Sequence, residues 1–140
     1  PAPEPPAPEP DARRIRSGGE TILLVEDEAT LLQTATRMLE SLGYAVMATS
    51  SPEEALRLAE RHRDRIDLLL TDVIMPEMNG PELVQRLKER FPALRHLYMS
   101  GYTANLIAEQ GVRDDSVNFI QKPFSRKTLA KKVRESIGKG

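Results

Sequence analysis

Short apolar runs alternate with amphipathic segments along the chain from residue 21 onward. The runs have the length and composition of buried strands, and they lie at residues 22–25, 44–48, 66–71, 94–99 and 116–120. The first run is followed by an apolar stripe at helical spacing: Leu31, Ala35, Met38 and Leu42. Further helices are predicted at residues 52–63, 80–90, 104–110 and 125–138, although the segment 104–110 has little apolar periodicity.

Local signals mark where several of these helices begin or end. Gly43 is expected to end the first helix. In the second, Ser51 is a predicted cap, Pro52 suits the first turn, and Glu54 completes a capping box with Ser51. Ser125 is a predicted cap for the last helix.

Strand and helix patterns alternate five times, which is typical of βαβ units and a parallel sheet. The strand runs are almost continuously apolar, as expected when helices cover both faces of the sheet. We therefore expect an α/β fold. We predict a flavodoxin-like, doubly wound (βα)5 sandwich with its parallel strands in the order 2-1-3-4-5.

Composition excludes several classes of protein. The 140 residues are 39% hydrophobic and 29% charged, which fits one soluble globular domain. A net charge of −1 gives no global field that would recruit nucleic acid or an anionic membrane surface. Cysteine is absent, which excludes thiol chemistry and is compatible with a reducing, cytoplasmic compartment. No apolar run reaches transmembrane length, and no signal-peptide pattern opens the chain.

The first residues differ from the rest, because six of the first ten are proline. Such a segment has no apolar face to bury and is expected to be an extended spacer. We predict a disordered linker over residues 1–19, a domain over 20–138 and a tail at 139–140. Because the chain begins with Pro1 rather than Met, we interpret it as a piece of a longer protein.

Polar side chains follow four of the five predicted strands: Glu26-Asp27-Glu28, Asp72, Ser100-Gly101 and Gln121-Lys122-Pro123. In an open α/β sheet, sites lie outside the carboxyl ends of the strands. With the second strand at the edge, the other four are neighbours. We therefore expect these polar residues to meet on one rim.

The rim has the composition of a phosphoryl site. Glu26, Asp27 and Asp72 would repel one another by about 4 kcal/mol for each pair at 4 Å and an effective dielectric near 20. A hard divalent cation such as Mg²⁺ relieves this repulsion. Lys122 adds a positive charge and Ser100 a hydroxyl donor, so a phosphoryl group would be well stabilised there. Asp72, in the middle, is the predicted nucleophile.

Each feature also has an ordinary structural explanation. The acidic triplet suits a helix N-terminus, and Asp72 could cap a turn. The Asn79-Gly80 pair after Asp72 and the Ser100-Gly101 pair suit turns, and Lys122-Pro123 suits a loop that stops a strand. Four such coincidences, each at an expected strand end, favour a functional site.

At these residues the sequence resembles the receiver domain of two-component response regulators. The segments that carry the resemblance are LLVEDE, LLLTDVIMPEMNG, YMSGY and FIQKPF, and the similarity covers about residues 20–138. The resemblance implies that Asp72 accepts a phosphoryl group from a phosphohistidine. It implies that Asp27, Asp72 and the backbone carbonyl of Ile74 bind Mg²⁺ directly, with Glu26 acting through water.

The resemblance also assigns the remaining roles. Lys122 would pair with the phosphoryl group, and the peptide before Pro123 would be cis. Ser100 would hydrogen-bond a phosphoryl oxygen, and Phe119 matches the aromatic switch position. Glu26 stands where Asp is commoner and Ser100 where Thr is commoner, and both keep the functional group. Phe119 lacks the hydroxyl of the frequent Tyr, so it would act through packing.

We expect a switch in which phosphorylation draws Ser100 and Lys122 inward and repacks the face formed by the fourth and fifth β/α units. The segment 104–110 would be its mobile part. Gly80 is expected to permit the turn of the loop behind Asp72. Slow autophosphatase activity is also expected, with water attacking the acyl phosphate.

The expected partner is a histidine kinase or a histidine phosphotransfer domain. The proline-rich spacer and the YMSGY segment suggest the C-terminal receiver of a hybrid sensor histidine kinase; a single-domain regulator is the alternative. His62 and His96 are interpreted as structural or exposed. The basic residues of the last helix are interpreted as a solvated face, so neither nucleic-acid binding nor membrane contact is predicted.

Two other classes of protein fit the sequence less well. An aspartyl-phosphate hydrolase of the haloacid-dehalogenase type needs a second acid two residues after its nucleophile, where Ile74 stands. A nucleotide-binding Rossmann domain needs its glycine-rich turn after the first strand, whereas Gly18-Gly19 precede it. A degenerate receiver that acts as a docking module is a further alternative.

Overall fold

The computed structural model describes residues 19–62, 65–101 and 119–138. The predicted linker before residue 19, the predicted helix at 104–110 and the tail lie outside these residues. The elements follow in the order β1 (Thr21–Val25), α2 (Ala29–Ser41), β2 (Ala45–Thr49), α3 (Pro52–Arg61), β3 (Leu68–Asp72), α4 (Gly80–Arg90), β4 (Arg95–Ser100), β5 (Phe119–Gln121) and α6 (Arg126–Ile137).

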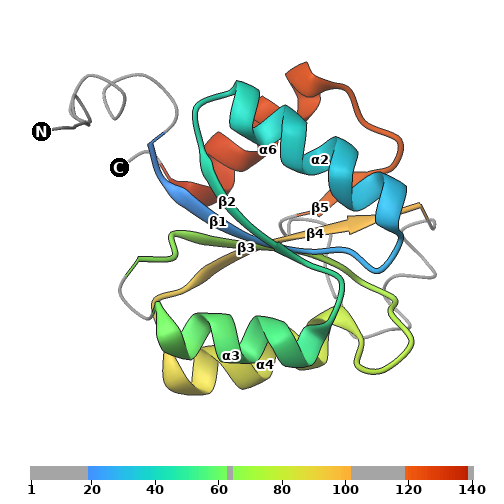
Figure 1. Cartoon of the computed structure of the whole chain (residues 1–140). Helices are drawn as coiled ribbons and strands as arrows, with labels where there is room; N and C mark the ends of the chain where they lie inside the picture. Colours follow the sequence, from blue (N-terminus) through green and yellow to red (C-terminus); the bar gives the residue numbers. More distant parts are fainter. Residues whose placement is uncertain (1–18, 63–64, 102–118, 139–140) are drawn as a thin grey trace, which may run out of the picture.

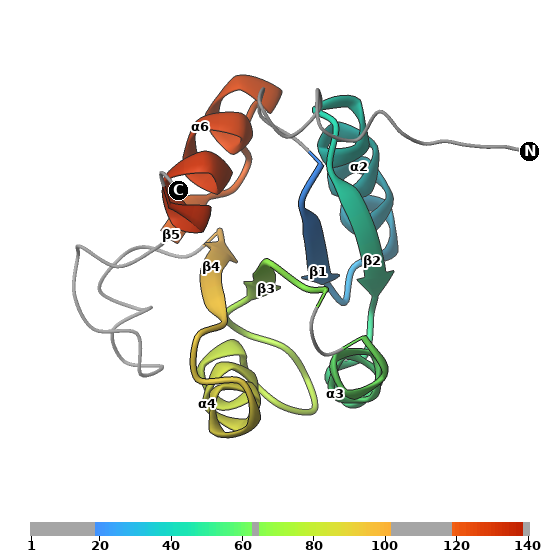
Figure 2. The same ribbon diagram turned by 90° about the vertical axis from the view of Figure 1, so that its left-hand side faces the viewer.

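The strands form one parallel sheet in the order β2-β1-β3-β4-β5, as predicted. Helices α2 and α6 cover one face, and α3 and α4 cover the other (Figures 1 and 2). This three-layer arrangement confirms the expected doubly wound sandwich.

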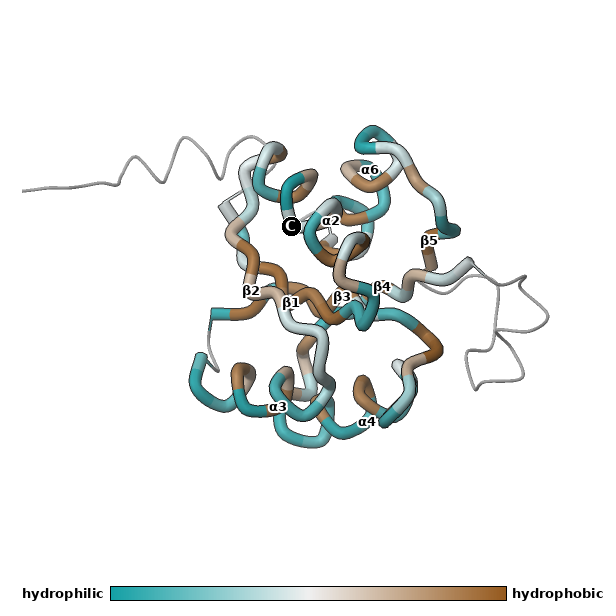
Figure 3. Tube along the Cα trace, turned by 45° about the vertical axis from the view of Figure 1, so that its right-hand side comes forward, coloured by the Kyte–Doolittle hydropathy of each residue, from teal (hydrophilic) through white to brown (hydrophobic). Residues whose placement is uncertain are grey.

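Alternating side chains of the strands supply two cores. In β1, Ile22 and Leu24 pack toward α2 and α6, while Leu23 and Val25 pack toward α3 and α4. The four side chains are fully buried. Figure 3 shows the apolar strands between helices whose outer faces are hydrophilic. Because both faces are covered, the strands read as continuous apolar runs rather than alternating ones.

Strands β2, β3 and β4 lie one or two residues nearer the carboxyl end than predicted. Tyr44 and Leu94 bury their side chains just before the strands, without belonging to them. At the other end, polar residues continue the parallel ladder: Thr49 pairs with Val25, Asp72 with Met99. The apolar runs therefore indicate which residues are buried, whereas the ends of the strands are set by hydrogen bonds to neighbouring strands. Of the fifth predicted strand, residues 116–118 lie outside the described part.

The helix caps were largely predicted. Ser51 and Ser125 cap α3 and α6 through hydrogen bonds from the N–H groups of Glu54 and Thr128. The reciprocal half of the predicted capping box is wrong, because the Ser51 N–H donates to Thr49 Oγ1 at 3.1 Å instead of to Glu54.

Within the described residues, no helix is long and apolar enough to cross a membrane.

His96, near the start of β4, gives a pH-dependent stability. Burial lowers its pKa to about 4, and the charge of Lys88 adds to the effect. Between pH 6.5 and 4, therefore, His96 is protonated in the unfolded chain but stays neutral in the folded chain. The contribution of His96 to stability is fully present above pH 6.5 and is lost as the pH falls to 4. We expect protonation of His96 in the unfolded chain to lower the free energy of unfolding by about 1–2 kcal/mol, allowing for the partial exposure of the side chain.

Urea unfolding at pH 7 and pH 5 measures this effect. His96→Gln should lose less stability between the two values than the wild-type chain loses. An equal loss in both chains would show that other groups cause the acid sensitivity.

Candidate functional site

The carboxyl ends of β1, β3 and β4 and the turn after β5 surround a cleft of about 480 Å³. Predicted site residues line it: Glu26, Asp27, Asp72, Ile74, Ser100 and Lys122. Phe119 is not among its lining residues. It pairs with Tyr98 at the start of β5 and packs, half-buried, against the core on the α3 and α4 side.

Asp72 ends the buried strand β3 and is itself 3% exposed. Its Oδ1 lies 2.6 Å from Lys122 Nζ. Its Oδ2 accepts no hydrogen bond from any residue that the structure describes. Burial raises the pKa of Asp72 to about 8, the neighbouring Glu26 carboxylate adds to the rise, and Lys122 opposes it. The carboxylate is thus rigidly placed, with one oxygen held and the other buried without a donor.

The acidic triplet after β1 divides its functions. Glu26 is 2% exposed; its Oε1 accepts a hydrogen bond from Lys122 Nζ at 2.7 Å and its Oε2 from the Glu28 N–H at 2.9 Å. Asp27 is exposed. Glu28 caps α2 by accepting from the Leu31 N–H at 2.9 Å. The helix-terminus explanation of this segment therefore holds for Glu28, while Glu26 belongs to the cleft.

One carboxylate oxygen from each of Glu26, Asp27 and Asp72 lies within 4.8 Å of the others. Three carboxylates against one ammonium leave an excess of negative charge, and hard oxygen donors are those that Mg²⁺ prefers. The unbonded Asp72 Oδ2 adds a buried acceptor to this group. The residues therefore fit a divalent cation.

Lys122 connects the two buried carboxylates. Burial alone would lower its pKa, but the hydrogen bonds and charges of Asp72 and Glu26 outweigh burial and raise the pKa. The ammonium therefore stays charged. The Lys122 N–H donates to the Ser100 carbonyl at 2.8 Å, and the Lys122–Pro123 peptide is cis, as expected. Ser100 itself, at the end of β4, is 3% exposed and lines the cleft.

Gly80 has a role that the sequence did not reveal. The turn that it was expected to permit needs no positive φ at this residue; among the described glycines, positive φ values occur at 19, 43 and 138. Instead, a Cβ on Gly80 would overlap the carbonyl oxygen of Asp72 and lie 3.1 Å from Val73 Cα. The Gly80 N–H donates to the Val73 carbonyl at 2.7 Å. The start of α4 thus packs directly on the backbone that carries Asp72.

Residues 22–134 match the family model described as the response regulator receiver domain. The chain belongs to this family. The match lies within the predicted domain, and it agrees with the order of the strands and with the resemblance noted in the motifs.

Known receiver-containing proteins give the same result. This receiver domain is 39% identical over 123 residues to the sensor kinase CckA of Brucella abortus (strain 2308), a similarity that covers 88% of this chain and 13% of CckA. It is 31% identical over 117 residues to the response regulator receiver protein CpdR of the same strain, covering 83% of this chain and 95% of CpdR. The solved receiver domain of the hybrid histidine kinase CckA superposes with a TM-score of 0.70 at 36% identity, covering 84% of this chain and 99% of that one.

The first curated relatives are much longer than this chain. It spans 13% of CckA, 18% of a putative two-component response regulator of Arabidopsis thaliana, and 24% of the transcriptional regulator NtrC of Azospirillum brasilense. The similarity therefore concerns the receiver domain.

Proposed function

We propose that Asp72 is the phosphoacceptor of this receiver domain and that it takes the phosphoryl group from a phosphohistidine. The observation that carries the proposal is the carboxylate of Asp72 at the cleft: Lys122 fixes its Oδ1, and its Oδ2 is buried and accepts no hydrogen bond from the described residues. Oδ2 attacks phosphorus, the phosphorus–nitrogen bond breaks, and its electron pair stays on the imidazole that leaves. Lys122 holds a positive charge beside the transferring group.

Mg²⁺ would be held by Asp27, Asp72 and the Ile74 carbonyl, with Glu26 acting through water. Its chemistry is to neutralise charge on the phosphoryl oxygens. Glu26 also keeps Lys122 in place through the hydrogen bond of 2.7 Å. The haloacid-dehalogenase alternative is disfavoured because Ile74, which is exposed and lines the cleft, offers no acid there.

Phosphorylation would act as a switch. The new dianion draws the Ser100 hydroxyl and Lys122 toward Asp72, and because β4 and β5 are paired, the shift reaches Phe119 through Tyr98. Slow hydrolysis by water would return the domain to its resting state. The degenerate docking module remains the alternative if no phosphoryl group is taken up.

Intact mass tests the proposal. After incubation with acetyl phosphate and Mg²⁺, the chain should gain one phosphoryl group, and chelation of the ion should abolish the gain. A folded chain that gains nothing with Mg²⁺ supplied would favour the docking module instead.

We propose that the domain works in the cytoplasm as part of a hybrid histidine kinase. Support comes from CckA, of which this chain resembles the receiver part. CpdR, which the similarity covers almost entirely, keeps the single-domain regulator as the alternative.

A second surface, next to the cleft, supports the proposal that the partner docks through a helix. A groove of about 430 Å³ beside the cleft is lined by apolar parts of α2 and of the segment after β5, among them Leu31, Met38, Pro123 and Phe124. Leu31 is 38% exposed, which is unusual for so large an apolar side chain in the described residues. We propose that a helix of the kinase or phosphotransfer domain packs here while its phosphohistidine enters the cleft.

Thr34→Arg tests this docking surface, because Thr34 lines the groove and not the cleft. Phosphotransfer from a phosphorylated histidine phosphotransfer domain should slow by about tenfold, the effect of losing one well-packed interface contact. Phosphorylation by acetyl phosphate should not change. Gln33→Arg, on the same helix outside the groove, is the matched control. Equal rates in both variants would contradict the assignment of this surface.

A further inference from the structure

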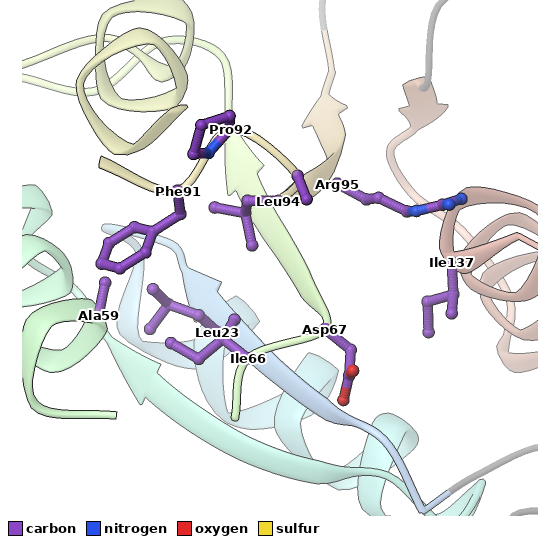
Figure 4. Close-up of a pocket in the computed structure, with 10 residues that line it drawn as sticks. Leu23, Ala59, Ile66, Asp67, Phe91, Pro92, Leu94, Arg95 and Ile137 are labelled. Carbon is purple, nitrogen blue, oxygen red and sulfur yellow. The ribbon is translucent and has the colours of Figure 1, made fainter. Parts of the chain in front are cut away.

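Another cavity lies at the opposite end of the sheet from the phosphoacceptor cleft. It has a volume of about 370 Å³ and opens at the amino ends of the strands, next to the segments that precede β3 and β4. Leu23, Ile66, Phe91 and Leu94 give it an apolar floor (Figure 4). About five residues of strand separate this end from Asp72, which is roughly 16 Å. The cavity is therefore distinct from the proposed phosphorylation site.

The cavity has one acidic and one basic residue at its rim. Asp67 lines it, and Figure 4 shows the Arg95 side chain extending toward Ile137 on the other side. Arg95 is exposed. An apolar floor between two opposite charges suits a peptide segment that carries one large apolar side chain between charged neighbours.

The chain enters the domain beside this cavity. The Thr21 N–H donates to Asp67 Oδ2 at 2.9 Å, and the Asp67 N–H donates to the Thr21 carbonyl at 2.8 Å. Glu20 is held by Arg134 Nη2 at 2.9 Å. The carboxylate that lines the cavity thus binds the residue at which β1 begins, and the chain enters β1 at the same amino end of the sheet.

The sequence before Gly19 offers one suitable anchor. Residues 11–16 read Asp-Ala-Arg-Arg-Ile-Arg, and Ile15 is the one large apolar side chain in residues 1–18, whose other uncharged residues are Pro, Ala, Ser and Gly. Ile15 precedes Gly19 by four positions, a reach of up to about 14 Å. The segment carries an acid before Ile15 and bases on both sides of it, which complements the two charges at the rim.

We propose that residues 11–16 dock in this cavity, with the Ile15 side chain on the apolar floor, Arg14 or Arg16 facing Asp67, and Asp11 facing Arg95. Because the segment is tethered four residues from the domain, its effective concentration is in the millimolar range, and weak contacts suffice. The docked segment would fix the direction in which the proline-rich residues leave the domain. The proposal is independent of phosphorylation at Asp72.

Methyl NMR on the whole chain with labelled isoleucine tests the docking. The expected result is a cross-relaxation contact between the Ile15 and Ile66 methyl groups, together with a shift of the Ile66 signal in Ile15→Ser. Ala12→Ser, a matched change in the same segment, should leave Ile66 where it is. An Ile15 methyl with the shift of an unstructured isoleucine and no contact to Ile66 would overturn the proposal.

Limited trypsin digestion gives a second readout. Cleavage after Arg13, Arg14 and Arg16 should be about tenfold faster in Ile15→Ser than in the wild-type chain, which corresponds to a tenfold preference for the docked state. Equal cleavage rates would overturn the docking. Protection that depends on Ile15 without the contact to Ile66 would overturn the assigned cavity.

Discussion

The Asp72→Asn chain is expected to take up no phosphoryl group under conditions that fully phosphorylate the wild-type chain. An amide oxygen has nearly the shape of a carboxylate oxygen but lacks the charge and nucleophilicity that the transfer requires. The rate should fall by at least about a thousandfold, as when a catalytic nucleophile is removed. Intact mass over time, with acetyl phosphate and Mg²⁺, measures the loss.

The free energy of unfolding should not fall with this substitution. Lys122 keeps its partner Glu26 at 2.7 Å, and the carboxylate that is removed is one whose charged form is disfavoured by burial, as its raised pKa indicates. Glu77→Gln is the matched control, since Glu77 is an exposed acid in the same loop and does not line the cleft. Its phosphorylation rate should equal that of the wild type. Uptake of one phosphoryl group by the Asp72→Asn chain would mean that another residue is the acceptor.

Gly80→Ala is expected to cause a large loss of stability for the addition of a single methyl group. The added Cβ would overlap the Asp72 carbonyl oxygen, and both partners are backbone, which cannot move aside as a flexible side chain would. We expect the free energy of unfolding to fall by about 2–4 kcal/mol, in the range of severe overpacking. Helix propensity acts the other way, since Ala is the better helix former, but by only about 1 kcal/mol.

Phosphorylation of the Gly80→Ala chain should also slow, because relief of the overlap displaces the backbone of Asp72. Gly101→Ala is the matched control for stability. Among the described residues, the nearest atom to such a Cβ is Lys122 Cβ at 4.0 Å, so the free energy of unfolding should change by about 1 kcal/mol or less. Urea denaturation compares the two variants, and an unchanged midpoint for Gly80→Ala would contradict the role of the close approach.

The position of Asp72 could be predicted because its cause is local. A continuous apolar run predicts a strand covered on both faces, and a carboxylate at its end is placed at the rim by the geometry of parallel sheets. The same logic predicted that Ser100 and Lys122 would line the cleft with it, as they do. The apolar pattern was sufficient to place these three residues at one end of the sheet, because neighbouring parallel strands end at the same rim.

The roles within Glu26, Asp27 and Glu28 could not be separated from the sequence. Three adjacent acids have the same composition signal, yet one is 2% exposed against Lys122, one is exposed at the cleft, and one caps α2. The division depends on where β1 stops and α2 starts, and a shift of one residue would exchange the roles. Element ends are set by hydrogen bonds between strands that are distant in sequence.

The reason for the glycine at position 80 and the partner of the Ser51 N–H could not be identified from the sequence for a related reason. Glycine suggested a turn conformation, but the requirement comes from the Asp72 carbonyl, eight residues away in sequence and in direct contact in space. The Ser51–Glu54 pattern suggested a reciprocal capping box, but Thr49 lies close enough to accept the Ser51 N–H first. Sequence patterns give local preferences, and tertiary contacts decide between them.

The central claim, that Asp72 is the phosphoacceptor, is tested most directly by locating the acyl phosphate. The chain is phosphorylated with acetyl phosphate and Mg²⁺, reduced with borohydride, which converts an aspartyl phosphate to homoserine, and mapped by peptide mass spectrometry. We predict homoserine at position 72 and unmodified residues at 26, 27 and 100. A reduced side chain at Glu26 or Asp27, or a phosphate on Ser100 with an unmodified Asp72, would contradict the claim.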